Sequence, residues 1–193
     1  MPSEIRIYFE GDKSLKPGFD AFFANIRRRG SEQRCRVSLV ATGGTPEQDF
    51  SIALRKHPDA WNILLRDSEG PIRVDESALL CQKQQWPTSH VASIFWMVEM
   101  MESWFHADKD ALAKFYGRNF DRDKLKSNPN VEDIPKKDLM DGLKDSTKGT
   151  KKGRYHKTRH APALLELIAP TRVREAAPNC DKIFQSLLAR LGE

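Results

Sequence analysis

The stretch WNILLRDSEG, residues 61–70, decides the fold of this 193-residue chain. Its first six residues have the apolar composition of a buried strand, and two acids separated by one serine follow at once. In an extended chain Asp67 and Glu69 would point to the same side, about 6 Å apart, and repel by roughly 2 to 3 kcal/mol at an effective dielectric near 20. A raised pKa, a basic neighbour or a divalent cation must offset this repulsion.

Two further strands precede this one. Residues 4–9 and 35–41 alternate apolar and polar side chains, a pattern typical of strands. The spacing of apolar residues predicts a helix from residue 19 to a stop at Gly30, and a capping pattern predicts another over residues 45–56. Since parallel neighbours need helical crossovers, this alternation predicts an α/β fold with a parallel sheet flanked by helices.

The remainder of the chain is predicted to be mainly helical. Residues 75–82 favour a short helix, and residues 91–107 favour one largely buried helix. On that helix Glu99, Glu102 and His106 would form a narrow polar stripe, which is typical of a solvated face. We therefore expect an α/β core over residues 1–90 and a helical extension over residues 91–193, packed on the core, with a basic loop at about residues 144–160.

Composition limits the function classes. The charged fraction of 31 % and the hydrophobic fraction of 39 % are those of a globular protein. The sequence contains neither a secretory signal nor a run of about 20 apolar residues, so we expect a cytoplasmic protein without a membrane partner. Three widely spaced cysteines indicate neither a disulfide framework nor a zinc site. The net charge of +5 permits a phosphate-bearing partner.

Acids stand at the ends of two predicted strands. Glu10 follows the first strand, and Asp67 and Glu69 follow the third. Ligands of open α/β sheets bind at the carboxyl ends of the strands, where these acids meet if the two strands are near neighbours. Three carboxylates suit Mg²⁺ or Mn²⁺, so we predict that Glu10, Asp67 and Glu69 are metal ligands and catalytic residues for phosphodiester cleavage or phosphoryl transfer. Acids before a glycine also form turns or cap helices, and this alternative stays open.

This arrangement resembles the Toprim domain, the catalytic α/β module of topoisomerases, primases and OLD-family nucleases. Toprim domains carry a glutamate at the end of the first strand and a D-x-D pair at the end of the third. Glu10 and the pair Asp67 and Glu69 match these positions, with glutamate in place of the second aspartate. The resemblance implies a Toprim-like sheet and a Mg²⁺-dependent enzyme acting on nucleic acid.

Longer segments resemble a family of small stand-alone bacterial proteins of undetermined function, grouped with Toprim-like and RloB-like proteins. These segments are IYFEGD, TGGTPEQDF, LLRDSEGP, MMESWFHADKDAL, FYG, NPNVEDIPK and YHKTRHAPALLE. Some members are encoded beside ATPases in phage-defence clusters, which implies a partner ATPase and a role in anti-phage defence. The resemblance also makes Glu102 and Asp108 candidate acids of the site, whereas the pattern alone favours a solvated Glu102 and an Asp108 that caps the next helix.

A basic segment, KGTKKGRYHKTRH, covers residues 148–160 and contains no acid. We predict that its cations bind the phosphates of DNA or RNA, with Tyr155 as an accompanying aromatic, although a solvated loop is the alternative. These cations are Lys148, Lys151, Lys152, Arg154, Lys157 and Arg159. His156 and His160 have helical spacing but lack a third zinc ligand nearby, and His156 is a candidate proton donor.

Three functions are weighed. The first is a metal-dependent nuclease of Toprim type that acts in anti-phage defence. The second is a non-catalytic subunit that binds nucleic acid or an ATPase through the basic segment and the helical tail. The third, a phosphoacceptor domain of receiver type, requires two further strands that are not recognisable after residue 70. The sequence leaves open whether the substrate is DNA or RNA, whether a partner controls the activity, and which oligomer forms.

Overall fold

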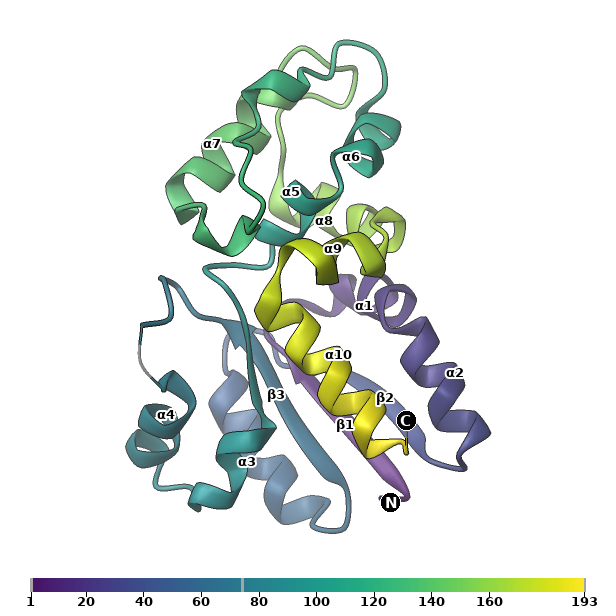
Figure 1. The fold of residues 1–193 in the computed structure, drawn as a ribbon, viewed down its shortest axis with the longest axis vertical. Helices are drawn as coiled ribbons and strands as arrows, with labels where there is room; N and C mark the ends of the chain where they lie inside the picture. Colours follow the sequence, from purple (N-terminus) through teal and green to yellow (C-terminus); the bar gives the residue numbers. More distant parts are fainter. Residues whose placement is uncertain (1, 74, 193) are drawn as a thin grey trace.

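Four parallel strands form the centre of the protein in the order β2-β1-β3-β4 (Figure 1). The strands are β1 (Glu4–Phe9), β2 (Arg36–Ala41), β3 (Trp61–Asp67) and β4 (Ile94–Met97). The computed structural model describes residues 2–73 and 75–192. Because β1 and β3 are direct neighbours, with Phe9 opposite Leu65, both strands end at the same edge of the sheet. The predicted α/β class is confirmed.

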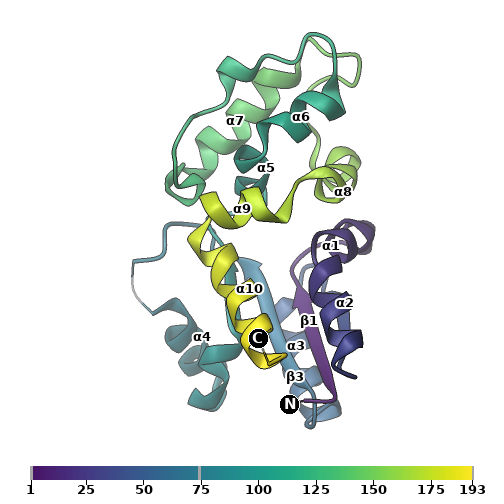
Figure 2. The same ribbon diagram turned by 45° about the vertical axis from the view of Figure 1, so that its right-hand side comes forward.

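Helices cover both faces of the sheet (Figures 1 and 2). On one face α1 (Lys16–Phe22), α2 (Ala24–Glu32) and α10 (Pro178–Arg190) pack on the larger apolar core. On the other face α3 (Pro46–Lys56) and α4 (Glu76–Gln84) pack on a smaller one. Burial on both sides explains why β3 reads as an almost continuous apolar run.

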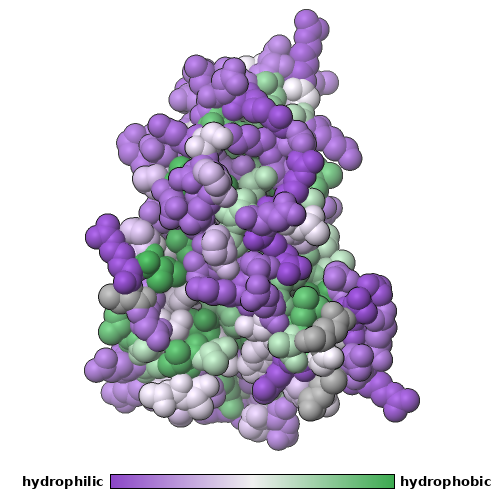
Figure 3. Space-filling model, viewed as in Figure 1, coloured by the Kyte–Doolittle hydropathy of each residue, from purple (hydrophilic) through white to green (hydrophobic). Residues whose placement is uncertain are grey.

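The remaining helices gather beyond the carboxyl ends of the strands, in a helical lobe that is mostly hydrophilic on the face shown in Figure 3. They are α5 (Ser103–Ala107), α6 (Lys109–Tyr116), α7 (Lys136–Thr147), α8 (Lys157–Leu167) and α9 (Pro170–Ala176). Helix α8 packs on α1, and α10 returns to the sheet, where it packs on β4. The lobe therefore lies over the edge at which the predicted acids meet.

The predicted helix over residues 91–107 is wrong. A 3-10 helix covers Thr88–Ser93, β4 follows, and only Ser103–Ala107 is α-helical. The segment pairs with β3, with Ile94 opposite Leu64, and its apolar side chains are divided between the two faces of the sheet. A strand buried on both sides and a buried helix have the same apolar composition, so periodicity does not separate them. As a result, the sheet extends past residue 90.

The predicted helix from residue 19 to Gly30 also differs in detail. It begins at Lys16, breaks at Phe23 and continues past Gly30 to Glu32. Gly30 lies against β2, where a Cβ atom would come within 2.6 Å of Val37 Cγ2 and 2.7 Å of the Cys35 carbonyl oxygen. The glycine therefore permits close packing of helix on strand rather than ending the helix.

Other features of the chain agree with the sequence. Helix α3 covers the predicted residues, with Pro46 in its first turn. The cysteines Cys35, Cys81 and Cys180 are buried and form no disulfide. Within residues 2–73 and 75–192, no helix has the length and apolar character needed to span a membrane.

Candidate active site

Glu10 and Asp67 meet at the carboxyl edge of the sheet. Glu10 directly follows β1, and the next residue, Gly11, has a φ of +139°, which L residues rarely adopt. The chain therefore turns away at once and leaves the Glu10 side chain at the edge. The backbone N–H of Asp67 donates to Glu10 Oε2 at 3.2 Å, and the N–H of Glu10 donates to the Leu65 carbonyl at 2.8 Å.

Asp67 is held between the sheet and the helical lobe. Its side chain is buried, and Oδ1 accepts a hydrogen bond of 2.8 Å from the Met101 backbone N–H. Oδ2 lies 3.8 Å from Lys157 Nζ, at the start of α8. Asp67 thus joins the end of β3 to two segments that are distant in sequence.

Glu102 is the second acid beside Lys157. Its side chain is fully buried, and Oε2 lies 3.5 Å from Lys157 Nζ. Oε1 accepts a hydrogen bond of 2.8 Å from the hydroxyl of the buried Tyr155. Glu10, Asp67, Glu102 and Lys157 are called the acidic site below.

The charged groups of the acidic site shift one another's pKa values. Burial raises the pKa of Asp67 to about 7, and the nearby carboxylates of Glu102 and Glu10 add to this rise against the attraction of Lys157. Burial also raises the pKa of Glu10, although Arg66 and the Asp67 amide oppose the shift. For Lys157, burial lowers the pKa, but Glu102 and Asp67 outweigh it and raise the value above the usual one. The Lys157 ammonium therefore opposes the rise in the pKa of Asp67 but does not remove it.

Glu69 lies at the periphery rather than beside Asp67. Strand β3 ends at Asp67, and Glu69 has a φ of +62°, so the extended geometry that would align the two side chains does not continue. The Glu69 carboxylate is half-exposed and pairs with Lys136, and its N–H donates to the Glu99 carbonyl at 2.9 Å. Its role as a metal ligand stays a prediction.

Arg66 provides a cation on the outer side of Glu10. Its Nε lies 3.6 Å from Glu10 Oε2, and its guanidinium pairs with Glu47 of α3. The same guanidinium lies over the Trp96 ring, 5.6 Å from the centroid. Through these contacts Arg66 is held beside the Glu10 carboxylate and restrains its position.

The predicted solvated stripe of Glu99, Glu102 and His106 does not exist, because the three residues do not share one helix. All three are buried. Glu99 accepts from the Lys136 backbone N–H at the start of α7. His106 Nε2 lies 3.0 Å from the Leu139 carbonyl, and burial lowers its pKa to about 4. Only Glu102 of the stripe reaches the acidic site.

Asp108 has a structural position. Its Oδ1 accepts from the Ala111 N–H at 3.1 Å and so caps α6, and Oδ2 accepts from the Ala169 N–H at 2.9 Å. Arg172 lies 3.1 Å from Oδ1. These partners agree with the capping alternative.

The predicted basic loop at about residues 144–160 is shorter in the structure, because α7 continues to Thr147 and α8 begins at Lys157. The Tyr155 N–H donates to Thr147 Oγ1 at 2.7 Å, and the Asn119 side chain donates to the Gly149 carbonyl at 3.2 Å. Tyr155 is buried and is not positioned to stack on a base. Lys157 faces the acidic site, whereas the other predicted cations are exposed: Lys148, Lys151, Lys152, Arg154 and Arg159. His156 is also exposed and contacts Thr158.

Sequence reasoning missed the roles of Tyr155 and Lys157. The signal was the tripeptide YHK, residues 155–157, at the start of α8, because a tyrosine and a lysine two apart reach the same carboxylate, Glu102. That signal becomes visible only once Glu102 is known to be buried.

The chemistry of the acidic site fits a hard divalent cation. All three acids offer oxygen, and Glu102 Oε2 is buried without a hydrogen-bond partner among the described residues. In the described parts of the chain no group of three or more His, Cys, Asp or Glu is arranged to hold a metal ion. Asp67 and Glu102 are the two carboxylates that could hold such a cation, with water or substrate oxygens completing its coordination, because Mg²⁺ usually keeps several waters.

Comparison with solved structures finds two OLD proteins of similar fold. The C-terminal region of the Burkholderia pseudomallei OLD protein is 13 % identical, with a TM-score of 0.48, over 97 % of this chain and 99 % of that chain. The C-terminal region of the Xanthomonas campestris pv. campestris OLD protein is 14 % identical, with a TM-score of 0.45, over 97 % and 95 % of the two chains. No curated protein matches the sequence.

A family model described as a domain of unknown function, DUF4276, matches residues 12–188. The match begins just after Glu10 and includes Asp67, Glu102 and Lys157. The protein therefore belongs to the DUF4276 family.

Proposed function

We propose that this protein is a metal-dependent nuclease of Toprim type that cleaves phosphodiester bonds in DNA or RNA. One observation carries the proposal: at the carboxyl edge of a parallel sheet, Asp67 and Glu102 lie beside Lys157, and Glu10 accepts a hydrogen bond from the Asp67 backbone. Burial raises the pKa of Asp67 to about 7, and the Glu102 and Glu10 carboxylates add to the rise. Such an arrangement costs stability, which is typical of a functional site.

The residues of the acidic site have distinct proposed roles. Asp67 and Glu102 would bind Mg²⁺ or Mn²⁺, which when bound activates water and neutralises charge on the scissile phosphate. The Lys157 ammonium is half-exposed and would donate to a phosphate oxygen of the substrate. Glu10 holds the end of β3 through the Asp67 amide, and its carboxylate orients a water or accepts its proton.

Nucleic acid would reach the site along the basic segment. The exposed cations Lys151 and Arg154 lie in the segment that leads into α8 and Lys157, and Arg159 lies in the first turn of α8. Each phosphate that they neutralise adds salt-dependent affinity. By its sequence resemblance to defence-associated proteins, the chain would act beside an ATPase against phage.

Glu10→Gln tests the nuclease proposal. We expect the parent chain to cleave single-stranded or double-stranded DNA or RNA with Mn²⁺ or Mg²⁺ and to lose that activity in EDTA. Replacing Glu10 removes the proton acceptor and a ligand-orienting charge, so cleavage should fall by about 10- to 100-fold. Glu4→Gln, an acid at the opposite end of β1, is the matched control. Equal cleavage by Glu10→Gln and the parent chain would remove Glu10 from the mechanism.

A second function is favoured by a specific observation: cations already accompany the acids, with Lys157 beside Asp67, Arg66 beside Glu10 and Lys136 on Glu69. In this alternative, the acids hold the helical lobe on the sheet, and the protein is a non-catalytic subunit that binds nucleic acid or an ATPase.

The double variant Lys151→Glu/Lys152→Glu separates the two functions when it is compared with Glu10→Gln. Charge reversal should weaken nucleic-acid binding by about tenfold or more at low salt under either function, since two phosphate contacts are lost. Metal-dependent cleavage that Glu10→Gln reduces is expected only if the protein is a nuclease. A non-catalytic subunit would show no such cleavage in either variant. Filter binding and a cleavage assay on the same preparations give both readouts. Binding that is unchanged by the charge reversal would contradict the role of the basic segment.

A further inference from the structure

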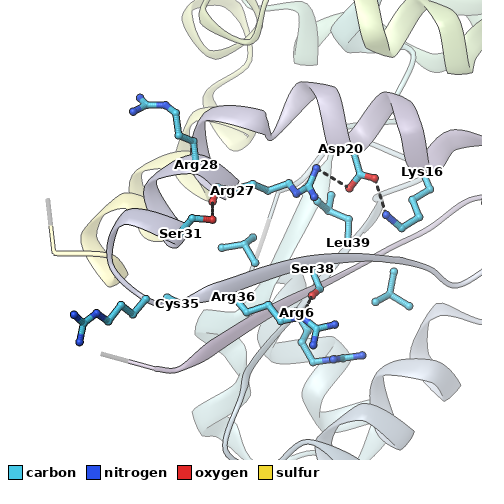
Figure 4. A pocket seen from close by; sticks show the side chains of 13 residues that line it. Arg6, Lys16, Asp20, Arg27, Arg28, Ser31, Cys35, Arg36, Ser38 and Leu39 are labelled. Carbon is cyan, nitrogen blue, oxygen red and sulfur yellow. Dashed lines mark hydrogen bonds and ion pairs between the residues drawn. The ribbon is translucent and has the colours of Figure 1, made fainter.

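A basic groove lies along the free edge of β2, outside the acidic site. It has a volume of about 900 Å³, and Figure 4 shows it between the α1–α2 helices and the edge of the sheet. Six cations line it, against one acid, Asp20. These cations are Arg6, Lys16, Arg27, Arg28, Arg34 and Arg36.

The edge of β2 offers backbone groups to the groove. β2 pairs with β1 and is the end strand of the sheet. The Arg36 N–H donates to the carbonyl of Ser3, which precedes β1, and the Thr42 N–H donates to the carbonyl of Phe9 in β1. Since alternate residues of a strand share a direction, the N–H and C=O groups of the odd-numbered residues Val37 and Leu39 face away from β1. Both residues line the groove.

Cations stand on both flanks of this edge (Figure 4). On one flank Lys16 and Arg27 share Asp20, at 2.6 and 3.6 Å. On the other flank Arg36 and Arg6 share Glu4, at 3.7 and 2.7 Å. Each flank therefore has two cations on one carboxylate and keeps an excess of positive charge.

We propose that the β2 edge binds an acidic, extended segment of a partner protein, which adds a fifth strand to the sheet. An added strand satisfies both the donors and the acceptors of Val37 and Leu39, and its side chains alternate between the two flanks. A phosphodiester backbone has acceptors for the N–H groups but no donor for the C=O groups, so an acidic peptide fits the edge better than DNA does. Arginine on an edge strand deters pairing with basic or neutral chains, and the same charge selects an acidic one.

The probe for this site is a fluorescein-labelled octapeptide that repeats Glu-Glu-Val-Val, acetylated and amidated, so that glutamates reach both flanks of an added strand. Fluorescence anisotropy is the readout. We expect saturable binding by the full chain. N-methylation of every second residue, which removes the pairing donors and leaves the charge, should weaken binding by about tenfold or more. Arg27→Glu/Arg36→Glu should do the same, because one cation is reversed on each flank. Arg55→Glu, on α3, is the matched control and should bind as the parent chain does.

Two results would overturn the proposal. The first is equal affinity of the methylated and unmethylated peptides, since this would reduce the interaction to charge alone. The second is displacement of the peptide by a dodecameric oligothymidylate whose own affinity falls in Arg27→Glu/Arg36→Glu, which would assign the groove to nucleic acid. Circular dichroism of the double variant checks that the fold is retained.

Discussion

Asp67→Asn is expected to lose metal-dependent cleavage by more than about 100-fold and yet to be more stable than the parent chain at pH 8. Cleavage falls because an amide neither carries the charge nor binds Mg²⁺ as a carboxylate does. Stability rises because the variant has no buried negative charge beside Glu10 and Glu102. The amide oxygen still accepts from the Met101 N–H, so the local fold is kept.

The pH dependence of stability checks the same residue. The pKa of Asp67 rises from 3.8 in the unfolded chain to about 7 in the folded chain. The folded state therefore binds the proton more tightly, and this contribution to stability is present below pH 3.8 and is lost as pH rises through about 7. This rise in the pKa of Asp67 corresponds to a change in the free energy of unfolding on the order of 4 kcal/mol. In Asp67→Asn this part of the pH dependence disappears.

The measurements are urea unfolding from pH 4 to pH 8 without metal and a cleavage assay at pH 8. Asp59→Asn, the same chemical change in an exposed turn, is the control and should match the parent chain in both. A variant of Asp67 that still cleaves, or whose stability follows the parent's pH profile, would contradict the assigned position of Asp67 in the site.

Lys157→Met should lower the free energy of unfolding at pH 8, because it leaves Asp67 and Glu102 without their shared cation. Removing one partner of a fully buried ion pair costs about 3 to 5 kcal/mol, and solvent screening of the half-exposed Lys157 reduces the expected loss to roughly 1 to 2 kcal/mol. The loss should shrink at pH 5.5, where Asp67 is protonated. Under the nuclease proposal, cleavage falls as well.

Metal binding gives this variant a second readout. If the acidic site holds a divalent cation, Mn²⁺ should raise the thermal midpoint of Lys157→Met by more than that of the parent chain, because the ion replaces the missing ammonium. Lys151→Met, in the same basic segment but exposed, is the control. Identical midpoints of Lys157→Met with and without Mn²⁺ would favour the non-catalytic function.

Part of this site could be predicted from the amino-acid sequence. Local patterns place Glu10 and Asp67 at the ends of parallel strands, and the rule that such strands expose ligands at their carboxyl edge brings the two together. The spacing of Asp67 and Glu69 was less informative. Their alignment depended on extended backbone up to Glu69, and that residue has a φ of +62° instead.

Local sequence patterns did not predict that Glu102, Tyr155 and Lys157 lie together in the site. An apolar run with acids at helical spacing indicates a helix with a solvated stripe, yet residues 94–97 pair with β3 and Glu102 is buried. The sequence pattern predicted Lys157 only as one of several phosphate-binding cations. Its partners Glu102 and Asp67 lie 55 and 90 positions earlier in the chain. Such contacts depend on how the lobe packs on the sheet.

The sequence by itself determined the first three strands, their parallel direction and the presence of acids at two strand ends, because strand composition and helix spacing are local properties. Tertiary structure alone decided that β4 completes the sheet, that Glu102 rather than Glu69 lies beside Asp67, and that Lys157 stands between these acids. The physical reason is that burial and charge pairing depend on distances between segments, which no local pattern encodes.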